Sequence, residues 1–168
     1  MARNRGLGEN LGRIYTALPT KATPTVVLAL YGDDGRLRWY RSHNFGALAR
    51  LKKGIPAILA ETPDLAHLVV EGGGDLFVPW QREAVRRGIH LHQIGAETWR
   101  HALLYDREQR SGLQAKQTAD ELARRVIAWS NARRPTSLRH DAAEAILVGL
   151  WGVIEVGWLA RVPDELRR

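Results

Sequence analysis

Two acidic residues, Asp141 and Glu144, lie three positions apart in a segment that we expect to be helical. Residues three apart share one face of a helix, so both carboxylates can point at the same place. Ala142 and Ala143 between them would allow this helix to lie close against a sheet. A capping box at the start of the helix is an equally good interpretation of these four residues.

A third carboxylate, Glu71, ends the apolar segment Leu65–Glu71 and is followed by three glycines. Such a segment is typical of a strand in the middle of a sheet, and ligands of open α/β sheets bind at the carboxyl ends of strands. A buried carboxylate is costly unless it is paired or bound to metal. Glu71, Asp141 and Glu144 are therefore candidate metal ligands, although a solvent-exposed strand end would also explain Glu71.

The chain is basic, with 25 Lys and Arg against 18 Asp and Glu and a net charge of +7. Such a surplus favours binding to polyanions, of which nucleic acid is the commonest inside a cell. A solubilising surface is the alternative interpretation. The charges are clustered in the second half of the chain, at Arg86-Arg87, Arg107 to Arg110, Arg124-Arg125 and Arg133-Arg134.

Two further features contain residues that could take part in binding or catalysis. Lys116 lies near the start of the helix predicted for Leu113–Asn131, where a lysine can neutralise a phosphate, although a single lysine on such a helix is more often solvated. His90 and His92 alternate on one predicted strand and so share a face. They indicate either a metal site or a structural role.

The elements that must position these residues predict a single α/β domain over residues 13–168, preceded by a flexible arm over residues 1–12. The fold expected is a mixed sheet of about five strands, the first three antiparallel and the rest parallel, flanked by helices. The predicted strands are Arg13–Leu18, Thr25–Tyr31, Arg36–Ser42, Leu65–Glu71 and Ile89–Ile94. The predicted helices are Phe45–Lys53 with a break at Gly54 and Pro56, Pro79–Arg87, Ala96–Leu104, Leu113–Asn131 and Leu138–Ala160, the longest.

The sequence contains no cysteine, which excludes disulfides and thiolate metal sites and fits a reducing cytoplasm. The longest apolar run, Ala145–Val153, is far shorter than the roughly 20 residues that cross a bilayer. The charged start of the chain is not followed by an apolar segment, so no secretory signal is expected. We therefore expect a cytoplasmic protein with no membrane association.

In three places the sequence resembles RuvC-like Holliday junction resolvases, which have the ribonuclease H fold. These are Glu71 at a strand end, the Gly112-x-x-x-Lys116 stretch that opens a helix, and His140-Asp-Ala-Ala-Glu144 at the start of the last helix. The similarity is best from about residue 65 to 150. It implies a metal-dependent endonuclease that cuts branched DNA, such as four-way junctions, as a homodimer, with carboxylates that hold Mg²⁺ or Mn²⁺.

The resemblance implies catalytic roles for Glu71, Asp141, Glu144 and Lys116, with Glu144 where the family usually has Asp. Its metal ligands would be the three carboxylates. We expect DNA contacts from basic residues near them, namely Arg107, Arg110, Lys116, Arg133, Arg134 and Arg139.

One departure from the family is serious. The family's first strand ends in an aspartate at the centre of the site, and Leu18 stands at the matching position here. A leucine cannot bind a cation, and Asp75 is the nearest candidate to replace the missing ligand. Three hypotheses remain. The first is a structure-selective endonuclease with an altered site, and the second is a pseudo-nuclease that binds branched DNA without cutting it. The third is a subunit with no DNA role.

Overall fold

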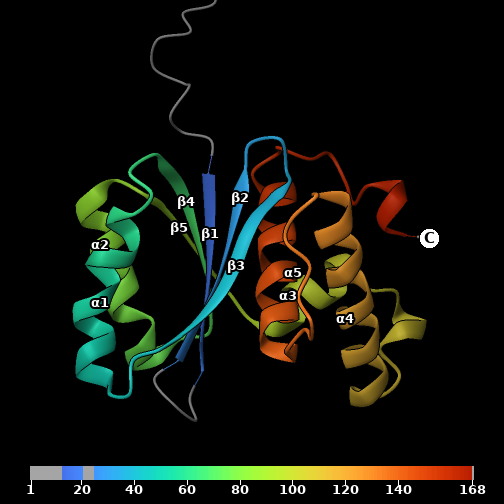
Figure 1. Ribbon diagram of the computed structural model, residues 1–168, viewed down its shortest axis with the longest axis horizontal. Coiled ribbons are helices and arrows are strands. Elements are labelled where there is room, and N and C mark those ends of the chain that lie inside the picture. Colours follow the sequence, from blue (N-terminus) through green and yellow to red (C-terminus); the bar gives the residue numbers. More distant parts are fainter. Residues whose placement is uncertain (1–12, 21–24, 168) are drawn as a thin grey trace, which may run out of the picture.

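The computed structural model describes residues 13–20 and 25–167, and the side chains from residue 25 onwards. They form a five-stranded sheet with helices on both faces (Figure 1). The strand order is β3-β2-β1-β4-β5, in which β1 pairs antiparallel with β2 and parallel with β4. The strands are β1 (Arg13–Thr20), β2 (Thr25–Gly32), β3 (Leu37–Asn44), β4 (Leu65–Glu71) and β5 (His90–Ile94). The mixed α/β architecture expected from the sequence is confirmed, while the predicted arm over residues 1–12 lies outside the described residues.

The helices lie on both faces of the sheet. Helices α1 (Leu48–Ala60) and α2 (Val78–Arg87) cover one face. On the other face α5 (His140–Glu155) lies against the sheet, with α3 (Ala96–Leu103) beside it and α4 (Gly112–Trp129) packed on its outer side (Figure 1). In the part of the chain that the structure describes, no helix is both long and apolar enough to span a membrane.

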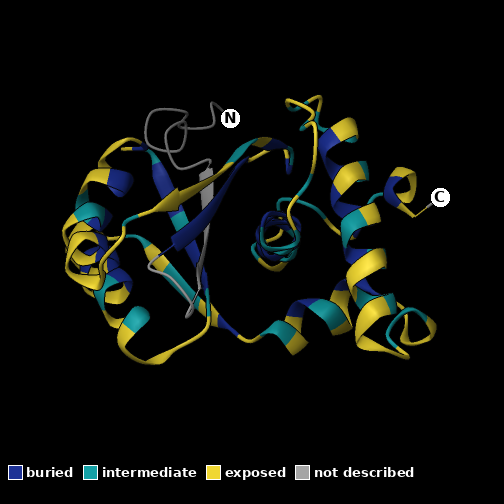
Figure 2. Ribbon diagram, turned by 60° about the horizontal axis from the view of Figure 1, so that its bottom comes forward, coloured by how far each residue is buried: buried dark blue, intermediate teal, exposed yellow. Residues whose placement is uncertain are grey.

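The central strands are apolar on both sides because both of their faces are covered. In β2, Val26, Leu28 and Leu30 pack against the α1–α2 layer. Val27 and Tyr31, which alternate with them, pack against the α3–α5 layer. Every residue of β2 is buried, and the yellow, exposed positions gather on the outer sides of the helices (Figure 2). In β4 this alternation places Glu71 on the same face as Val69, toward α3 and α5.

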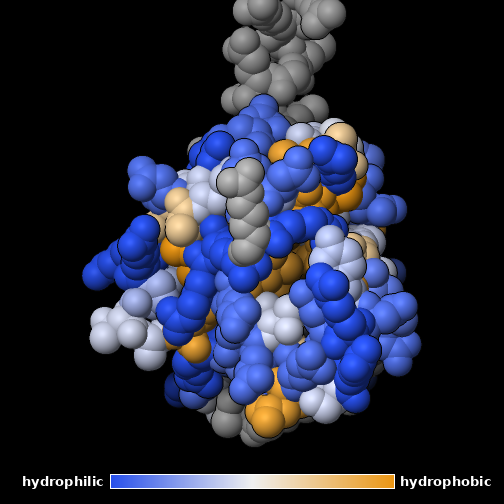
Figure 3. All heavy atoms as spheres, turned by 90° about the vertical axis from the view of Figure 1, so that its right-hand side faces the viewer, coloured by the Kyte–Doolittle hydropathy of each residue, from blue (hydrophilic) through white to orange (hydrophobic). Residues whose placement is uncertain are grey.

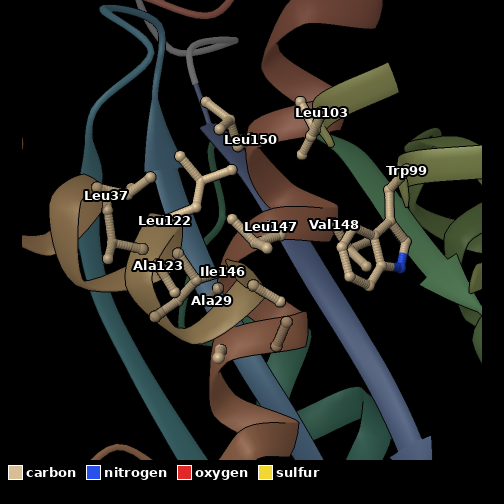
Figure 4. Packing of buried hydrophobic residues seen from close by; sticks show 14 of the residues in the cluster. Ala29, Leu37, Trp99, Leu103, Leu122, Ala123, Ile146, Leu147, Val148 and Leu150 are labelled. Carbon is tan, nitrogen blue, oxygen red and sulfur yellow. The ribbon is translucent and has the colours of Figure 1, made fainter. Parts of the chain in front are cut away.

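Helix α5 lies in the middle of the larger core (Figure 4). Small residues at its start allow close approach to the sheet, and Ala143 and Ala145 are fully buried. The buried Tyr31 hydroxyl donates a hydrogen bond to the carbonyl of Ile146, which ties β2 to the middle of the helix. The first turn of α5, with its two acidic residues, is thereby held in a fixed position relative to the sheet.

The predicted break at Gly54 and Pro56 is wrong, because α1 continues through both residues. Pro56 has no N–H to donate within the helix. Its carbonyl accepts a hydrogen bond of 3.1 Å from Arg87 of α2. The burial of four apolar side chains outweighs the missing helical bond, and these are Leu51, Ile55, Ile58 and Leu59.

The last helix is also shorter than predicted, and among the described elements α4 is longer, at 18 residues against 16. Helix α5 ends at Glu155 because Gly157 adopts a left-handed conformation with φ of 81°. The amide N–H groups of Trp158 and Leu159 then turn back to the carbonyl of Val153, at 2.9 and 3.1 Å. This is the usual glycine-dependent way of ending a helix.

The position of α5 in the core predicts a large effect of Leu147→Ala. Leu147 is fully buried, and such a truncation costs about 2–5 kcal/mol of unfolding free energy because it leaves a cavity. Leu113→Ala is the matched control, since Leu113 is 69% exposed on α4, and a change within about 0.5 kcal/mol is expected for it. Urea denaturation measures both. Equal effects of the two substitutions would contradict the described packing.

Candidate functional site

Glu71 lies where the carboxyl ends of the parallel strands meet. It pairs in register with Ile94 of β5, and the amide of Gly72 donates to the carbonyl of Ile94 at 3.0 Å. Gly72 has φ of 104°, a backbone conformation that favours glycine, so the chain turns away immediately after Glu71. The Glu71 side chain is half-buried. The alternative interpretation of Glu71 as a freely exposed strand end is therefore wrong.

The Glu71 carboxylate is held by an indole. Trp99 of α3 is fully buried, and its Nε1–H donates a hydrogen bond of 2.9 Å to Glu71 Oε2. Burial raises the pKa of Glu71 above its usual range, and the nearby Glu144 raises it further. The Trp99 hydrogen bond and Arg100 act in the opposite direction on the same pKa. The carboxylate is thus in an environment that disfavours its charge and favours a nearby cation.

The protein supplies such a cation itself. Arg100 of α3 forms an ion pair of 3.1 Å with Glu144 Oε1, and the Glu144 side chain is only 16% exposed. The guanidinium also lies 5.2 Å from the centroid of the Trp99 ring. Because Arg100 lowers the pKa of Glu71 as well, it interacts with both carboxylates. Arg100 and Trp99 therefore link Glu71 to Glu144.

His140 extends this network to α4. Its Nδ1 lies 3.2 Å from Asp120 Oδ1, and its Nε2 lies 3.2 Å from Glu144 Oε1. The imidazole therefore bridges two carboxylates on different helices. Residues four apart on a helix are neighbours, which explains the contact of His140 with Glu144.

Asp141 is directed differently from Glu144. Its Oδ1 accepts a hydrogen bond of 2.9 Å from the amide of Ala142, and its Oδ2 lies 3.3 Å from the guanidinium of Arg139. Helix α5 begins at His140 with Arg139 as its N-cap, and no side chain makes a capping hydrogen bond there. The capping-box interpretation of Asp141 and Glu144 is therefore wrong.

The other predicted site residues are dispersed. Lys116 is exposed on α4, one turn before Asp120. Asp75 lines a cavity together with residues of α1 and α2, among them Lys52 and Arg82, on the face of the sheet opposite to that of Glu71. The structure thus brings Glu71 and Glu144 together, but it does not bring Asp75 to them.

The magnesium ion implied by the family resemblance stays a prediction. Carboxylates are the donors that Mg²⁺ prefers. In the positions that the described side chains have, however, no three His, Asp or Glu residues are grouped closely enough to hold a metal ion. As they lie, Glu71 and Glu144 are engaged by Trp99 and Arg100, so the arrangement fits an ion-pair network rather than a metal centre.

The backbone register locates Leu18 relative to this network. Ala17 of β1 pairs with Val70 of β4, and the next residue in each strand is Leu18 and Glu71, respectively. The strand position beside Glu71 is therefore occupied by a residue type that offers no ligand.

The predicted DNA-binding arginines are distributed over the α3–α5 side of the molecule. Arg133 and Arg134 line an open cavity of about 450 Å³ together with Trp39 and Tyr40 of β3. Arg107 lies against the ring of Tyr105, 5.0 Å from its centroid, whereas Arg110 is exposed before α4. In contrast, Arg86 and Arg87 belong to α2 and pair with Glu83.

Histidines form a second polar cluster at the other end of β4 and β5. His67 of β4 was not singled out by the sequence, but its Nδ1 lies 3.2 Å from His92 Nε2, and its ring stacks with that of His90. Burial lowers the pKa of His67 to about 4, and the neighbouring His92 and His90 contribute to this shift. The alternation of His90 and His92 indicated their common face, but no pattern marked the cross-strand partner.

The comparisons with known proteins bear on the fold. No protein-family model matches the sequence, and no curated protein does. The solved structure of Thermus thermophilus RuvC matches with a TM-score of 0.60 and 15% identity, over 86% of this chain and 96% of that one. T. thermophilus RuvC in complex with a Holliday junction substrate matches with a TM-score of 0.58 and 12% identity, over 87% and 96%. The chain therefore has a RuvC-like fold, and at these identities the likeness establishes the fold alone.

The indole hydrogen bond predicts that Trp99→Phe raises the pKa of Glu71 further, because one hydrogen bond to the charged form is lost. Trp80→Phe is the matched control. Trp80 is equally buried, but its Nε1 has no hydrogen-bond partner among the described residues. NMR titration of the Glu71 side-chain carboxyl carbon measures both variants. An unchanged Glu71 pKa in Trp99→Phe would contradict the arrangement.

The raised pKa of Glu71 also predicts a dependence of stability on pH. The folded state holds the Glu71 proton more tightly than the unfolded state, so Glu71 makes stability fall as pH rises above the unfolded value, near 4.5. In Glu71→Gln this fall should be smaller, and the variant should gain stability relative to the natural protein between about pH 4.5 and pH 7. Denaturation at a series of pH values measures the difference in unfolding free energy between Glu71→Gln and the natural protein. Glu97→Gln, at an exposed position, is the control. A difference that does not change with pH would refute the prediction.

Proposed function

We propose that this protein binds branched DNA, such as four-way junctions, through a RuvC-like fold, and that it does not cut the DNA. The likeness to a RuvC structure that contains a Holliday junction substrate supports the choice of ligand. A homodimer, as the family resemblance implies, and a cytoplasmic location are part of the proposal.

The observation that carries the proposal is the cavity in which arginines and aromatic residues meet. Arg133 and Arg134 stand beside Trp39 and Tyr40, and the carbonyl of Arg133 accepts a hydrogen bond of 3.3 Å from the Tyr40 hydroxyl. Arginines that contact phosphates beside aromatic rings that stack with bases form a common arrangement for binding single-stranded or unpaired nucleic acid. The arms of a four-way junction are fully paired, but stacking between arms is interrupted at the branch point, so base pairs there are the easiest to open onto such aromatic rings.

The surroundings of this cavity are suited to a polyanion. The segment that follows α4 begins beside Trp39 and Tyr40 of β3 and then runs along α5 to the start of that helix (Figure 1). It carries Arg133, Arg134 and Arg139. Arg124 of α4 lies near the same place, since it and Arg133 both act on the pKa of Tyr40. The outer surface on the α4 side is mainly hydrophilic (Figure 3). A backbone of phosphates along this segment would end at the acidic network of α5.

The acidic network supports binding without cleavage. A two-metal nuclease site needs several carboxylates that converge on cations. Here Arg100 already pairs with Glu144 and acts on Glu71, and Leu18 stands beside Glu71 in the register. The Arg100 guanidinium thus supplies a permanent positive charge at the place where a metal-dependent nuclease would hold cations.

Metal-dependent cleavage is the second candidate function, because one observation favours it. Glu71 and Glu144 approach each other in a partly dehydrated environment, and this proximity raises the pKa of Glu71. A divalent cation would relieve their repulsion if it displaced Arg100. In that function Glu71, Asp141 and Glu144 would be the ligands and Lys116 would contact the phosphate.

The binding proposal predicts that Arg133→Ala with Arg134→Ala weakens binding to a labelled four-way junction by at least about tenfold at low salt. The slope of log affinity against log salt should fall by about 2, roughly one for each lost phosphate contact. Gel shift and fluorescence anisotropy measure these quantities. The matched control, Arg50→Ala with Lys53→Ala, removes the same charge from exposed positions of α1 on the opposite layer. Equal weakening by the two double variants would show that only net charge matters.

The two candidate functions differ in a cleavage assay with the same junction. We expect no cutting by the natural protein in Mg²⁺ or Mn²⁺ under conditions in which the junction is fully bound. Cutting that is abolished by Glu71→Gln and by Asp141→Asn would establish the nuclease instead. If Leu18→Asp alone gains activity, the missing ligand of β1 is the reason that the natural protein does not cut.

A further inference from the structure

The three histidines of β4 and β5 form a group that the proposed function does not use. His67 pairs in register with His90, and Val69 pairs with His92, so the three imidazoles occupy adjacent positions on two parallel strands. His67 lies four residues before Glu71. At about 3.3 Å per residue the two side chains are separated by roughly 13 Å along β4. The cluster is therefore distinct from the acidic network.

We propose that His67, His90 and His92 form a binding site for a divalent transition metal ion such as Zn²⁺, between β4 and β5. A metal with two imidazole ligands at about 2.0–2.1 Å in tetrahedral geometry holds their nitrogens about 3.3–3.4 Å apart. His67 Nδ1 and His92 Nε2 are 3.2 Å apart. These two nitrogens are thus already close to the separation that a tetrahedral ion requires.

His90 is the third ligand. Its ring is exposed and stacks with that of His67, with 5.3 Å between the centroids and an angle of 28° between the planes. Because the three side chains do not lie as a formed coordination sphere, the His90 side chain has to turn toward the other two nitrogens. Its exposure leaves room for that rotation. Two alternate histidines of one strand and a third on the next strand can then present three nitrogens on one side of the sheet.

The neighbours of the cluster suit a cation. Glu155, the last residue of α5, has a favourable charge interaction with His92. The Trp158 ring meets the His67 ring edge-on, with centroids 5.5 Å apart, and covers one side of the cluster. Imidazole ligands favour Zn²⁺, Ni²⁺ and Cu²⁺ over Mg²⁺, so this site and the acidic network differ in the ion that they would accept. Because β5 is an edge strand, a metal ion at this site would stabilise the pairing of β5 with β4.

The proposal predicts that the untagged full chain binds one Zn²⁺ per chain. His90→Gln and His92→Gln should each weaken this binding by at least about tenfold. Loss of a group that only supports a metal ligand already weakens metal affinity by about this factor. Isothermal titration calorimetry with ZnCl₂ measures affinity and stoichiometry. At the same Zn²⁺ concentration, the melting temperature should rise more in the natural protein than in either variant. An excess of Mg²⁺ should leave Zn²⁺ binding unchanged.

The matched controls are His43→Gln and His101→Gln, which remove exposed histidines elsewhere on the surface. Neither should change the Zn²⁺ affinity. An unchanged Zn²⁺ affinity in His90→Gln and His92→Gln, or an equal weakening by the control substitutions, would overturn the proposal. So would the absence of Zn²⁺ binding, and the contact of His67 with His92 would then be only a hydrogen bond. His90 is exposed, so its substitution keeps the test valid even if His92→Gln fails to fold.

Discussion

A carboxylate held at the partly buried end of β4 is the constraint on which the site depends. Burial disfavours the charge of Glu71, and the fold compensates with an indole N–H from Trp99 and a guanidinium from Arg100. Both donors come from α3. The positions of β4, α3 and the first turn of α5 are therefore coupled through one small group of charges, since Glu144 of α5 shares the same arginine.

This arrangement gives the RuvC-like fold a particular electrostatic character. In a metal site the carboxylates would be neutralised by exchangeable cations, whereas here the Arg100 side chain supplies the positive charge. The Arg100 pair with Glu144 and the Arg139 pair with Asp141 leave little uncompensated negative charge at the start of α5. A DNA backbone that approaches the arginines of the preceding segment would meet less repulsion there than at a group of free carboxylates.

Much of the fold follows from local patterns in the sequence. The apolar segment that ends at Glu71 and the hairpin of β2 and β3 were predictable because continuous apolar runs and glycine turns are local signals. The interruption expected at Pro56 was wrong because tertiary burial outweighed a local rule. The end of α5 at Glu155 depends on the left-handed Gly157, which helical periodicity alone did not indicate.

The site was predictable only in part. Glu71, Asp141 and Glu144 stood out because acidic residues at a strand end and on one helix face are unusual. Their partners Arg100, Trp99 and Asp120 did not, because a contact across elements that are distant in sequence leaves no local pattern. The same is true of His67, which meets His92 only through the parallel register of β4 and β5.

The most direct test of the central claim, that Arg100 replaces a metal ion between Glu71 and Glu144, is a crystal structure of the protein soaked in Mn²⁺, with anomalous scattering recorded at the manganese edge. The account predicts no manganese peak between these two carboxylates and an Arg100 guanidinium that stays paired with Glu144. A manganese peak between them, with Arg100 displaced, would contradict it.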